Sequence, residues 1–101
     1  MSSYLFADLE ITDPATFATY REQVAPMIAH YGGRYLVRGG AVTVTEGAED
    51  FPLHRVIILE FPDMAALRRF YDSPDYAPLM ALRRAATVSR VALIEGYDPP
   101  A

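Results

Sequence analysis

The sequence predicts an α+β fold of the ferredoxin-like type, with the element order βαββαβ. Four short segments alternate apolar and polar residues or are apolar throughout, as strands do, and two longer segments carry apolar residues at helical spacing. Capping and turn-forming residues separate these segments. In this topology two right-handed crossovers place the helices on one face of a four-stranded antiparallel sheet, and the other face stays uncovered.

The first strand and the first helix have clear signals. The strand is predicted over residues 4–11, where apolar and polar side chains alternate. Asp13-Pro14 then indicates a helix start, with an acidic N-cap and proline in the first turn. The apolar stripe of this helix consists of Phe17, Tyr20, Val24, Met27, Ile28 and Tyr31. Pro26 interrupts the stripe and predicts a kink or a restart near Ala25, and Gly32-Gly33 predicts the end of the helix.

Two strand-like segments follow, residues 34–38 and 41–46, with Gly39-Gly40 between them. Two glycines at this place fit a tight hairpin or a bulge in one bent strand, and we favour the bent strand. Residues 47–52 predict a loop. Residues 54–61 form the clearest strand of the chain, and because its middle is apolar on both faces we expect burial on both sides.

The second helix is predicted in two pieces. Pro62-Asp63 ends the preceding strand and caps a helix over residues 64–71. Ser73-Pro74 caps the second piece, which runs to about Ala86.

The last strand is predicted over residues 88–97, so that residues 1–97 form a single domain and residues 98–101 a loose tail. The helix-free face of the sheet is predicted to be apolar. Its residues would be Tyr4, Phe6, Leu36, Val56, Ile58, Ala92 and Ile94. An uncovered apolar face should pack against another surface, so we expect a homodimer in which the bare faces of two copies form a dimeric α+β barrel.

Composition and charge exclude several functions. The chain has 101 residues, a net charge of −4 and no cysteine, which excludes disulfides, thiolate metal sites and cysteine nucleophiles. This charge argues against nucleic acid and anionic membranes as partners, and the third strand lacks the basic and aromatic positions of RNA-recognition domains. No apolar run could span a bilayer and the first residues lack a signal-peptide pattern, so we expect a cytoplasmic protein.

Neither a cofactor nor a metal is expected. All nine basic residues are arginine, which excludes a Schiff base on lysine and supplies planar cations suited to carboxylate or phosphate. His30 and His54 are the histidines of the chain, and they are not at metal-ligand spacing. The glycine pairs Gly32-Gly33 and Gly39-Gly40 fit neither a phosphate loop nor a dinucleotide fingerprint.

Several stretches resemble one family. They are Asp13-Pro14 with Phe17 and Tyr20, residues 31–40, residues 54–62, residues 70–76 with Pro78, Leu79 and Arg83, and Glu95-Gly96. Together they cover nearly the whole chain and are similar to the family called domain of unknown function 1330. The resemblance implies a dimeric α+β barrel. It implies no activity, because the family has no established one. Relatives by fold include cofactor-free monooxygenases, lactone isomerases and decarboxylase-like enzymes, so the analogy leaves the chemistry open.

Charged side chains are expected at one mouth of this barrel. Taking the first and third strands as parallel neighbours, we place Asp8 near Glu60; the second strand then brings Arg34 and Arg38 beside Glu60, and the fourth brings Arg90 beside Asp8. By alternation all five side chains point to the helix-free face. A polar cluster at the end of an apolar pocket is typical of a small-ligand site.

The hypothesis for this cluster assigns a role to each residue. Arg38 would bind a carboxylate or enolate oxygen, Glu60 would move a proton, and Tyr76 or Ser73 would orient the ligand. The remaining ligand-binding candidates are Asp8, Arg34 and Arg90. Two plainer interpretations stay open, an ion-pair network that closes the dimer and, for Ser73, helix capping alone.

The function hypothesis that follows is a small cofactor-independent enzyme acting on a small organic acid by proton transfer, as in isomerisation or decarboxylation. The alternative is a non-catalytic homodimer that binds a small ligand or is purely structural. An open cavity at the charged residues would favour the first hypothesis, and a cavity filled by side chains would favour the second.

Overall fold

The computed structural model describes residues 1–100. Its elements are β1 (Ser3–Ile11), α1 (Pro14–His30), β2 (Arg34–Arg38), β3 (Val56–Phe61), α2 (Met64–Tyr71), α3 (Ala77–Ala86) and β4 (Thr87–Glu95). This is the predicted ferredoxin-like α+β order with the second helix in two pieces, so the fold prediction is confirmed.

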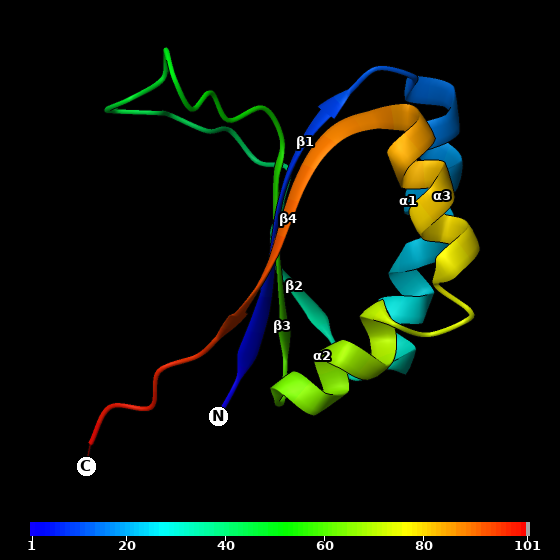
Figure 1. Ribbon diagram of the computed structural model, residues 1–101, viewed down its shortest axis with the longest axis vertical. Helices are drawn as coiled ribbons and strands as arrows, with labels where there is room; N and C mark the ends of the chain where they lie inside the picture. The colour runs from blue at the N-terminus through cyan, green and yellow to red at the C-terminus, as the bar shows by residue number, and fades with distance from the viewer. Residues whose placement is uncertain (101) are drawn as a thin grey trace.

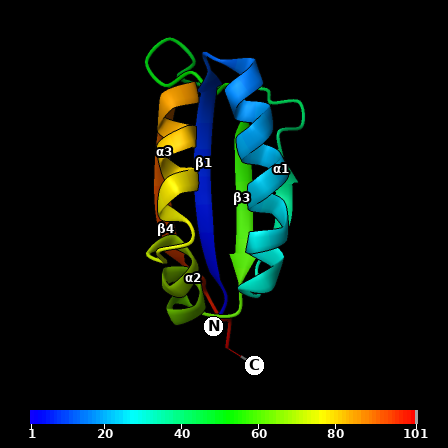
Figure 2. The same ribbon diagram turned by 90° about the vertical axis from the view of Figure 1, so that its right-hand side faces the viewer.

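The sheet has the strand order β2-β3-β1-β4, and every neighbouring pair is antiparallel. All three helices lie on one side of it (Figure 1). Viewed from the helix side, α1 lies in front of β3 and α3 lies toward β4, with β1 visible between them (Figure 2). The main core fills the space between helices and sheet and includes Leu5, Leu9, Phe17, Val24, Leu59, Phe61, Leu67 and Phe70.

Helix α1 begins and ends where the sequence predicts. The Asp13 carboxylate accepts a hydrogen bond from the Thr16 backbone N–H at 3.2 Å, and beyond the last turn Gly32 adopts a φ of 90° that favours glycine. The helix is continuous through Pro26, so the predicted restart is wrong. Pro26 and Glu22, whose carbonyl loses its partner, are both exposed, and water can satisfy that carbonyl.

The connection between β2 and β3 is a long loop. Residues 39–55 contain no strand, so the predicted bent strand over residues 41–46 is wrong. Gly39 adopts a φ of 71°, which turns the chain out of β2 directly after Arg38. A bulge does occur, but it lies between Tyr35 and Val37, inside β2.

Helix α3 starts later than the sequence predicts. Ser73-Pro74 was expected to begin this helix, but its first residue is Ala77. Ser73 Oγ instead accepts a hydrogen bond from the Tyr76 backbone N–H at 3.0 Å, which closes a turn before the helix. The serine therefore caps a turn, and the turn places Tyr76 at the N-cap of α3.

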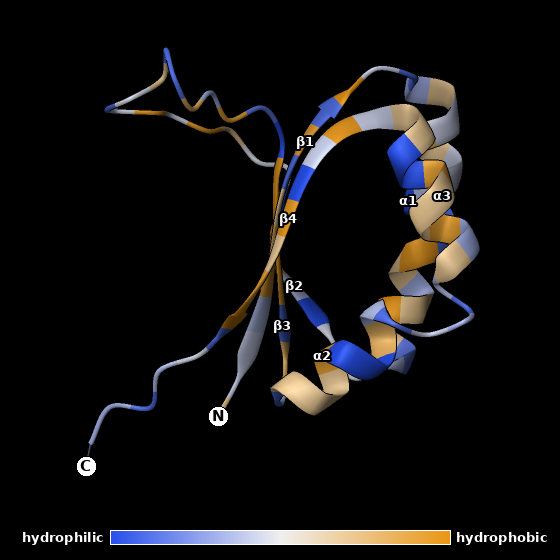
Figure 3. Ribbon diagram, viewed as in Figure 1, coloured by the Kyte–Doolittle hydropathy of each residue, from blue (hydrophilic) through white to orange (hydrophobic). Residues whose placement is uncertain are grey.

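The helix-free face of the sheet carries exposed apolar side chains. Leu36 and Ile94 are 46% and 49% exposed, and the strands are largely apolar along their middle (Figure 3). The β2–β3 loop and the C-terminal tail both extend to this side (Figure 1). Residues 98–100 of the predicted tail have no regular structure, and residue 101 lies outside the described residues.

Within residues 1–100, none of the helices has the length and hydropathy that crossing a membrane requires.

Candidate functional site

The five predicted charges do not form one cluster, and the two acids among them lie far apart. β1 and β3 are antiparallel, with Tyr4 opposite Glu60 and Asp8 opposite Val56. Asp8 and Glu60 therefore lie about 13 Å apart along the strands, at roughly 3.3 Å per residue. The prediction that they share one mouth is wrong, because it took these two strands as parallel.

Glu60 pairs with Arg34 on the helix-free face. The Arg34 Nε donates to Glu60 Oε1 at 2.7 Å, and the Tyr4 hydroxyl donates to Glu60 Oε2 at 3.4 Å. The hydrogen bond from Arg34 lowers the pKa of Glu60 below its usual value. The predicted proximity of Arg34 and Glu60 is confirmed, but the carboxylate stays ionised at neutral pH and is a poor proton donor there.

Asp8 pairs with Arg90 at the other end of the same face. Its carboxylate, on a residue only 4% exposed, accepts from the His54 backbone N–H at 2.7 Å and from Arg90 Nη2 at 3.3 Å. Burial raises the pKa of Asp8, but the hydrogen bonds from His54 and Arg90 outweigh it and lower the pKa overall. Because Arg90 Nη2 also donates to the Pro52 carbonyl at 3.0 Å, this group anchors the β2–β3 loop to the sheet.

Arg38 lies on the opposite face from Arg34. Without a bulge, two residues four apart on a strand share a face. The bulge between Tyr35 and Val37 adds one residue, so Arg38 pairs with Ile57 and faces the helices. The prediction that Arg38 points to the helix-free face is therefore wrong.

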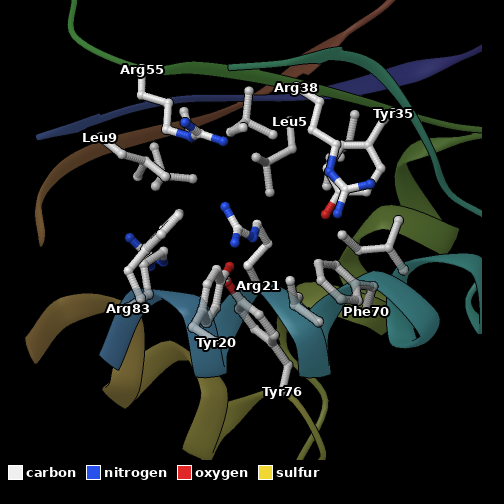
Figure 4. Close-up of a pocket in the computed structure, with 17 residues that line it drawn as sticks. Leu5, Leu9, Tyr20, Arg21, Tyr35, Arg38, Arg55, Phe70, Tyr76 and Arg83 are labelled. Atoms are coloured by element: carbon white, nitrogen blue, oxygen red, sulfur yellow. Dashed lines mark hydrogen bonds between the residues drawn. The ribbon is translucent and has the colours of Figure 1, made fainter. Parts of the chain in front are cut away.

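Arg38 enters a pocket between the helices and the sheet (Figure 4). Apolar side chains from β1, β3, α1 and β4 form most of its wall, among them Leu5, Ala7, Leu9, Leu59, Ile57, Val24, Ile28 and Val91. The polar lining residues are Arg21, Arg38, Arg55, Arg83, Tyr20, Tyr35 and Tyr76. The space between these side chains is about 570 Å³ when its open mouth is counted. The cavity that the centre of a water molecule can occupy is much smaller, about 50 Å³.

The four pocket arginines have no acidic partner in the described part of the chain. Within residues 1–100, no carboxylate lies within 4.0 Å of any of them, and no acid or histidine lines the pocket. Arg83 is 4% exposed; its Nη1 donates to Ser89 Oγ at 2.6 Å, and its buried Nε has no partner among the residues that the structure describes. The buried Nε of Arg55 is also without a partner in the described chain.

Two local contacts hold Arg55 at the pocket. Its guanidinium carbon lies 5.8 Å from the centre of the Phe17 ring, within the range of a cation–π contact. The guanidinium also packs directly against Gly39, where an added Cβ would lie 2.6 Å from the same carbon. Gly39 therefore permits both the end of β2 and the position of Arg55.

Three phenols line the pocket; Tyr76 is buried, and Tyr20 and Tyr35 are half-buried. The hydroxyls of Tyr20 and Tyr76 lie 2.9 Å apart and share a hydrogen bond. Burial raises the pKa of Tyr20, and the neighbouring Tyr76 raises it further. Burial also raises the pKa of Tyr35, although Arg38, stacked 4.5 Å above its ring, acts in the opposite direction. With raised pKa values, the hydroxyls of Tyr20 and Tyr35 stay protonated at neutral pH and can donate hydrogen bonds there.

The predicted candidates are thus distributed among three places. Arg38 and Tyr76 line the pocket, Asp8 with Arg90 and Arg34 with Glu60 occupy the helix-free face, and Ser73 caps the turn before Tyr76. Within the described chain, no group of acids and histidines could hold a metal ion.

Sequence reasoning missed Arg21, Arg55 and the role of Arg83 in the pocket. Two of them carried a readable signal. Arg21 stands at helical spacing between Phe17 and Val24, and Arg83 stands between Leu79 and Ala86. An arginine inside the buried stripe of a helix is a candidate for a functional charge, because arginine is rarely buried without a partner.

Comparison with known proteins supports the fold. The family model described as domain of unknown function 1330 matches residues 2–97, while no curated protein matches the chain. Among solved structures, RPA0582, a protein of unknown function from Rhodopseudomonas palustris, is 20% identical with a TM-score of 0.78, covering 97% of this chain and 84% of that one.

Two further structures are similar. SnoaB, a cofactor-independent oxygenase from Streptomyces nogalater, is 21% identical with a TM-score of 0.68, covering 97% of this chain and 95% of that one. A dimeric ferredoxin-like protein of unknown function from Jannaschia sp. CCS1 is 16% identical with a TM-score of 0.65, covering 95% of this chain and 100% of that one. At these identities the likeness shows the fold alone.

Proposed function

We propose that this chain, which belongs to the family described as domain of unknown function 1330, binds a small organic anion in the pocket between its helices and its sheet. The family description assigns no activity, so the proposal rests on the site itself. The observation that carries it is a largely apolar pocket lined by four arginines and, within the described residues, by no acid.

Burial without a partner is unfavourable for a guanidinium group. Desolvation of an ion costs several kcal/mol in proteins, and an opposite charge or hydrogen-bond acceptors are needed to offset it. Arg83 is almost fully buried, and the serine hydroxyl is neutral and accepts from one of its nitrogens. A bound carboxylate or enolate would supply the missing charge and the missing acceptors.

The walls indicate an organic anion. Leucine, isoleucine, valine and aromatic side chains surround the guanidinium groups and offer contact to a short hydrocarbon segment. The narrow space favours a small molecule. These features support the predicted class of ligand, a small organic acid, at a place other than the predicted mouth.

Among the predicted proton-transfer reactions, the pocket favours decarboxylation over isomerisation. Isomerisation needs a base to remove a proton from carbon, and no carboxylate or imidazole lines this pocket within the described chain. Decarboxylation of a β-keto acid needs none: the bond to the carboxylate breaks, carbon dioxide leaves, and the electron pair stays behind as an enolate.

The pocket residues can be assigned to these steps. Arg38 would stabilise the enolate oxygen, as predicted from the sequence, although from the helix-covered face. The Tyr76 hydroxyl, which shares a hydrogen bond with the Tyr20 hydroxyl, would donate the proton that completes the product and recover one from water. The acid–base role predicted for Glu60 is not carried forward, because its carboxylate lies on the other face.

Two assays test this proposal. Isothermal titration with butyrate, valerate and hexanoate should give saturable binding that is lost or weakened in Arg83→Met and kept in Arg69→Met, an exposed arginine of α2. Carbon dioxide release from acetoacetate should exceed the spontaneous rate and fall by about a hundredfold in Arg38→Met, the scale for loss of one group that stabilises an oxyanion. Binding without turnover would leave a non-catalytic binding protein, and absence of binding would contradict the proposal.

The second candidate function concerns the helix-free face. A homodimer through this face would bury the exposed Leu36 and Ile94 and the charged pairs at its two ends. The similarity to a dimeric ferredoxin-like protein favours it. Sedimentation should give twice the chain mass of 11.2 kDa, and Ile94→Glu should shift the protein to a monomer. A wild-type monomer would contradict this assembly and leave the pocket proposal intact.

A further inference from the structure

The four pocket arginines come from both walls. Arg38 and Arg55 extend from the sheet side, at the end of β2 and directly before β3, while Arg21 and Arg83 extend from α1 and α3 (Figure 4). A carboxylate has two oxygens and about four acceptor positions, enough for one bidentate arginine and two further donors, all of which must reach the same group. One such group would leave charge on the opposite wall without compensation.

The donors without partners lie on both walls as well. Among the described residues, the buried side-chain nitrogens without an acceptor are Nε of Arg55, on the sheet side, and Nε of Arg83, on the helix side. Each guanidinium is also fixed by its neighbours. Arg55 packs against Phe17 and Gly39, and Arg83 donates to the Ser89 hydroxyl, which holds both guanidinium groups at the pocket.

From these observations we propose that the pocket takes a small dianion, two acidic groups joined by a short apolar spacer, such as a dicarboxylate. The inference rests on the proposed function and names its substrate class. One acidic group accepts from the Arg55 wall and the other from the Arg83 wall. The spacer contacts the apolar side chains of the sheet wall, Leu5, Leu9 and Leu59.

Overall charge cannot produce this preference. The chain carries a net charge of −4, so its long-range field disfavours a dianion more than a monoanion. A preference for the dianion must therefore come from the local arginines. A compact dianion such as phosphate has no spacer and can engage only one wall, which separates the shape argument from the charge argument.

The test is isothermal titration of the full chain with glutarate, valerate and inorganic phosphate at constant ionic strength. Glutarate and valerate have equal carbon number and differ by one carboxylate. Glutarate should bind at least about tenfold more tightly than valerate, which is 1.4 kcal/mol, and also more tightly than phosphate. In Arg83→Met and, independently, in Arg55→Met, the affinity for glutarate should fall to that for valerate. In Arg69→Met, glutarate should still bind more tightly than valerate.

Each outcome decides between the two proposals. Equal affinities for glutarate and valerate overturn the dianion proposal and leave the proposed function standing. Phosphate binding as tightly as glutarate overturns the need for a spacer and with it this inference. Absence of binding by all three probes overturns both. Because the central comparison uses the unmodified protein, it holds even if one variant fails to fold.

Discussion

The two faces of the sheet use arginine in opposite ways. On the helix-free face, Arg34 and Arg90 each lie within 3.3 Å of a carboxylate, and both side chains are more than half exposed. On the helix-covered face, Arg83 is almost fully buried and, within residues 1–100, lacks a carboxylate partner, as do the other three pocket arginines. The same side chain closes a surface ion pair on one face and stays available for a ligand on the other.

This difference predicts different energetic roles. An exposed ion pair contributes little to stability because water screens it. Replacing Arg34 should therefore change the free energy of unfolding very little. A buried cation without a partner lowers the stability of the empty protein and is retained only if it serves another purpose. Arg83, the buried one among the pocket arginines, should therefore trade stability against binding.

The largest effect is expected for Arg83→Met. Loss of hydrogen bonds to a charged ligand should reduce affinity for the best-binding carboxylate by about thirtyfold, or about 2 kcal/mol. The empty variant should be more stable than the wild type by about 1 kcal/mol, which raises Tm by roughly 4–8 °C in a domain of this size. Titration and thermal unfolding measure the two effects.

Arg34→Met is the matched control on the other face. Arg34→Met should change the free energy of unfolding by less than about 0.5 kcal/mol and leave the affinity for the best-binding carboxylate unchanged. If Arg83→Met proves less stable than Arg34→Met and binds equally well, the arginines of the two faces do not differ in the way described.

The next effect concerns the glycine that positions Arg55. In Gly39→Ala the new Cβ would lie 2.6 Å from the guanidinium carbon of Arg55, at a φ of 71°. The free energy of unfolding should fall by more than about 1 kcal/mol. The affinity for glutarate should fall to that of Arg55→Met. Denaturant unfolding and titration measure both.

Gly47→Ala separates backbone strain from displacement of Arg55. Gly47 has a similar φ of 79°, but an added Cβ there meets nothing within 4 Å. Gly47→Ala should lose about as much stability as Gly39→Ala but bind glutarate as tightly as the wild type. Equal affinity in both variants would show that Gly39 does not position Arg55 for binding.

A smaller, pH-dependent effect is expected at Asp8. Its pKa is lower in the folded protein than in the unfolded chain, so the ionised form stabilises the fold above about pH 4, the unfolded value. That stabilisation is lost as the pH falls through the lower folded pKa. Asp8→Asn should therefore cost about 1 kcal/mol at pH 7 and much less near pH 3. A cost independent of pH, measured by urea unfolding, would contradict this role of the charge.

An effect no larger than that of Asp8→Asn is expected for Tyr76→Phe, which removes the hydrogen bond to the Tyr20 hydroxyl at 2.9 Å. Stability should fall by about 1 kcal/mol. Burial remains the main cause of the raised pKa of Tyr20, so that phenol should still not ionise at pH 10. Ultraviolet titration of the phenols tests this, and ordinary ionisation of Tyr20 in the wild type would contradict the burial.

The sequence predicts the elements of the fold well and the site only in part. Helix caps at Asp13 and Asp63 and the apolar spacing between them are local features, and local features can be read without a structure. The bulge between Tyr35 and Val37 depends on pairing with a distant strand, and it alone moves Arg38 to the other face.

The direction of the strands explains the other error. In a βαββαβ sheet the first and third strands are antiparallel, so Asp8 and Glu60 fall at opposite ends. This could have been worked out from the topology. The contribution of Arg55 could not, because it lies in a loop whose path is fixed by Gly39 and by the hydrogen bonds to Asp8.

The central claim is that the pocket arginines bind an organic anion and the surface arginines do not. Titration of the ¹⁵N-labelled protein with glutarate and with valerate, followed through the arginine Nε–Hε signals, tests it most directly. The account predicts saturable shifts of Arg55 and Arg83 with at least one of these acids and unchanged signals of Arg34 and Arg90. Shifts confined to Arg34 and Arg90, or no shifts with either acid, would contradict it.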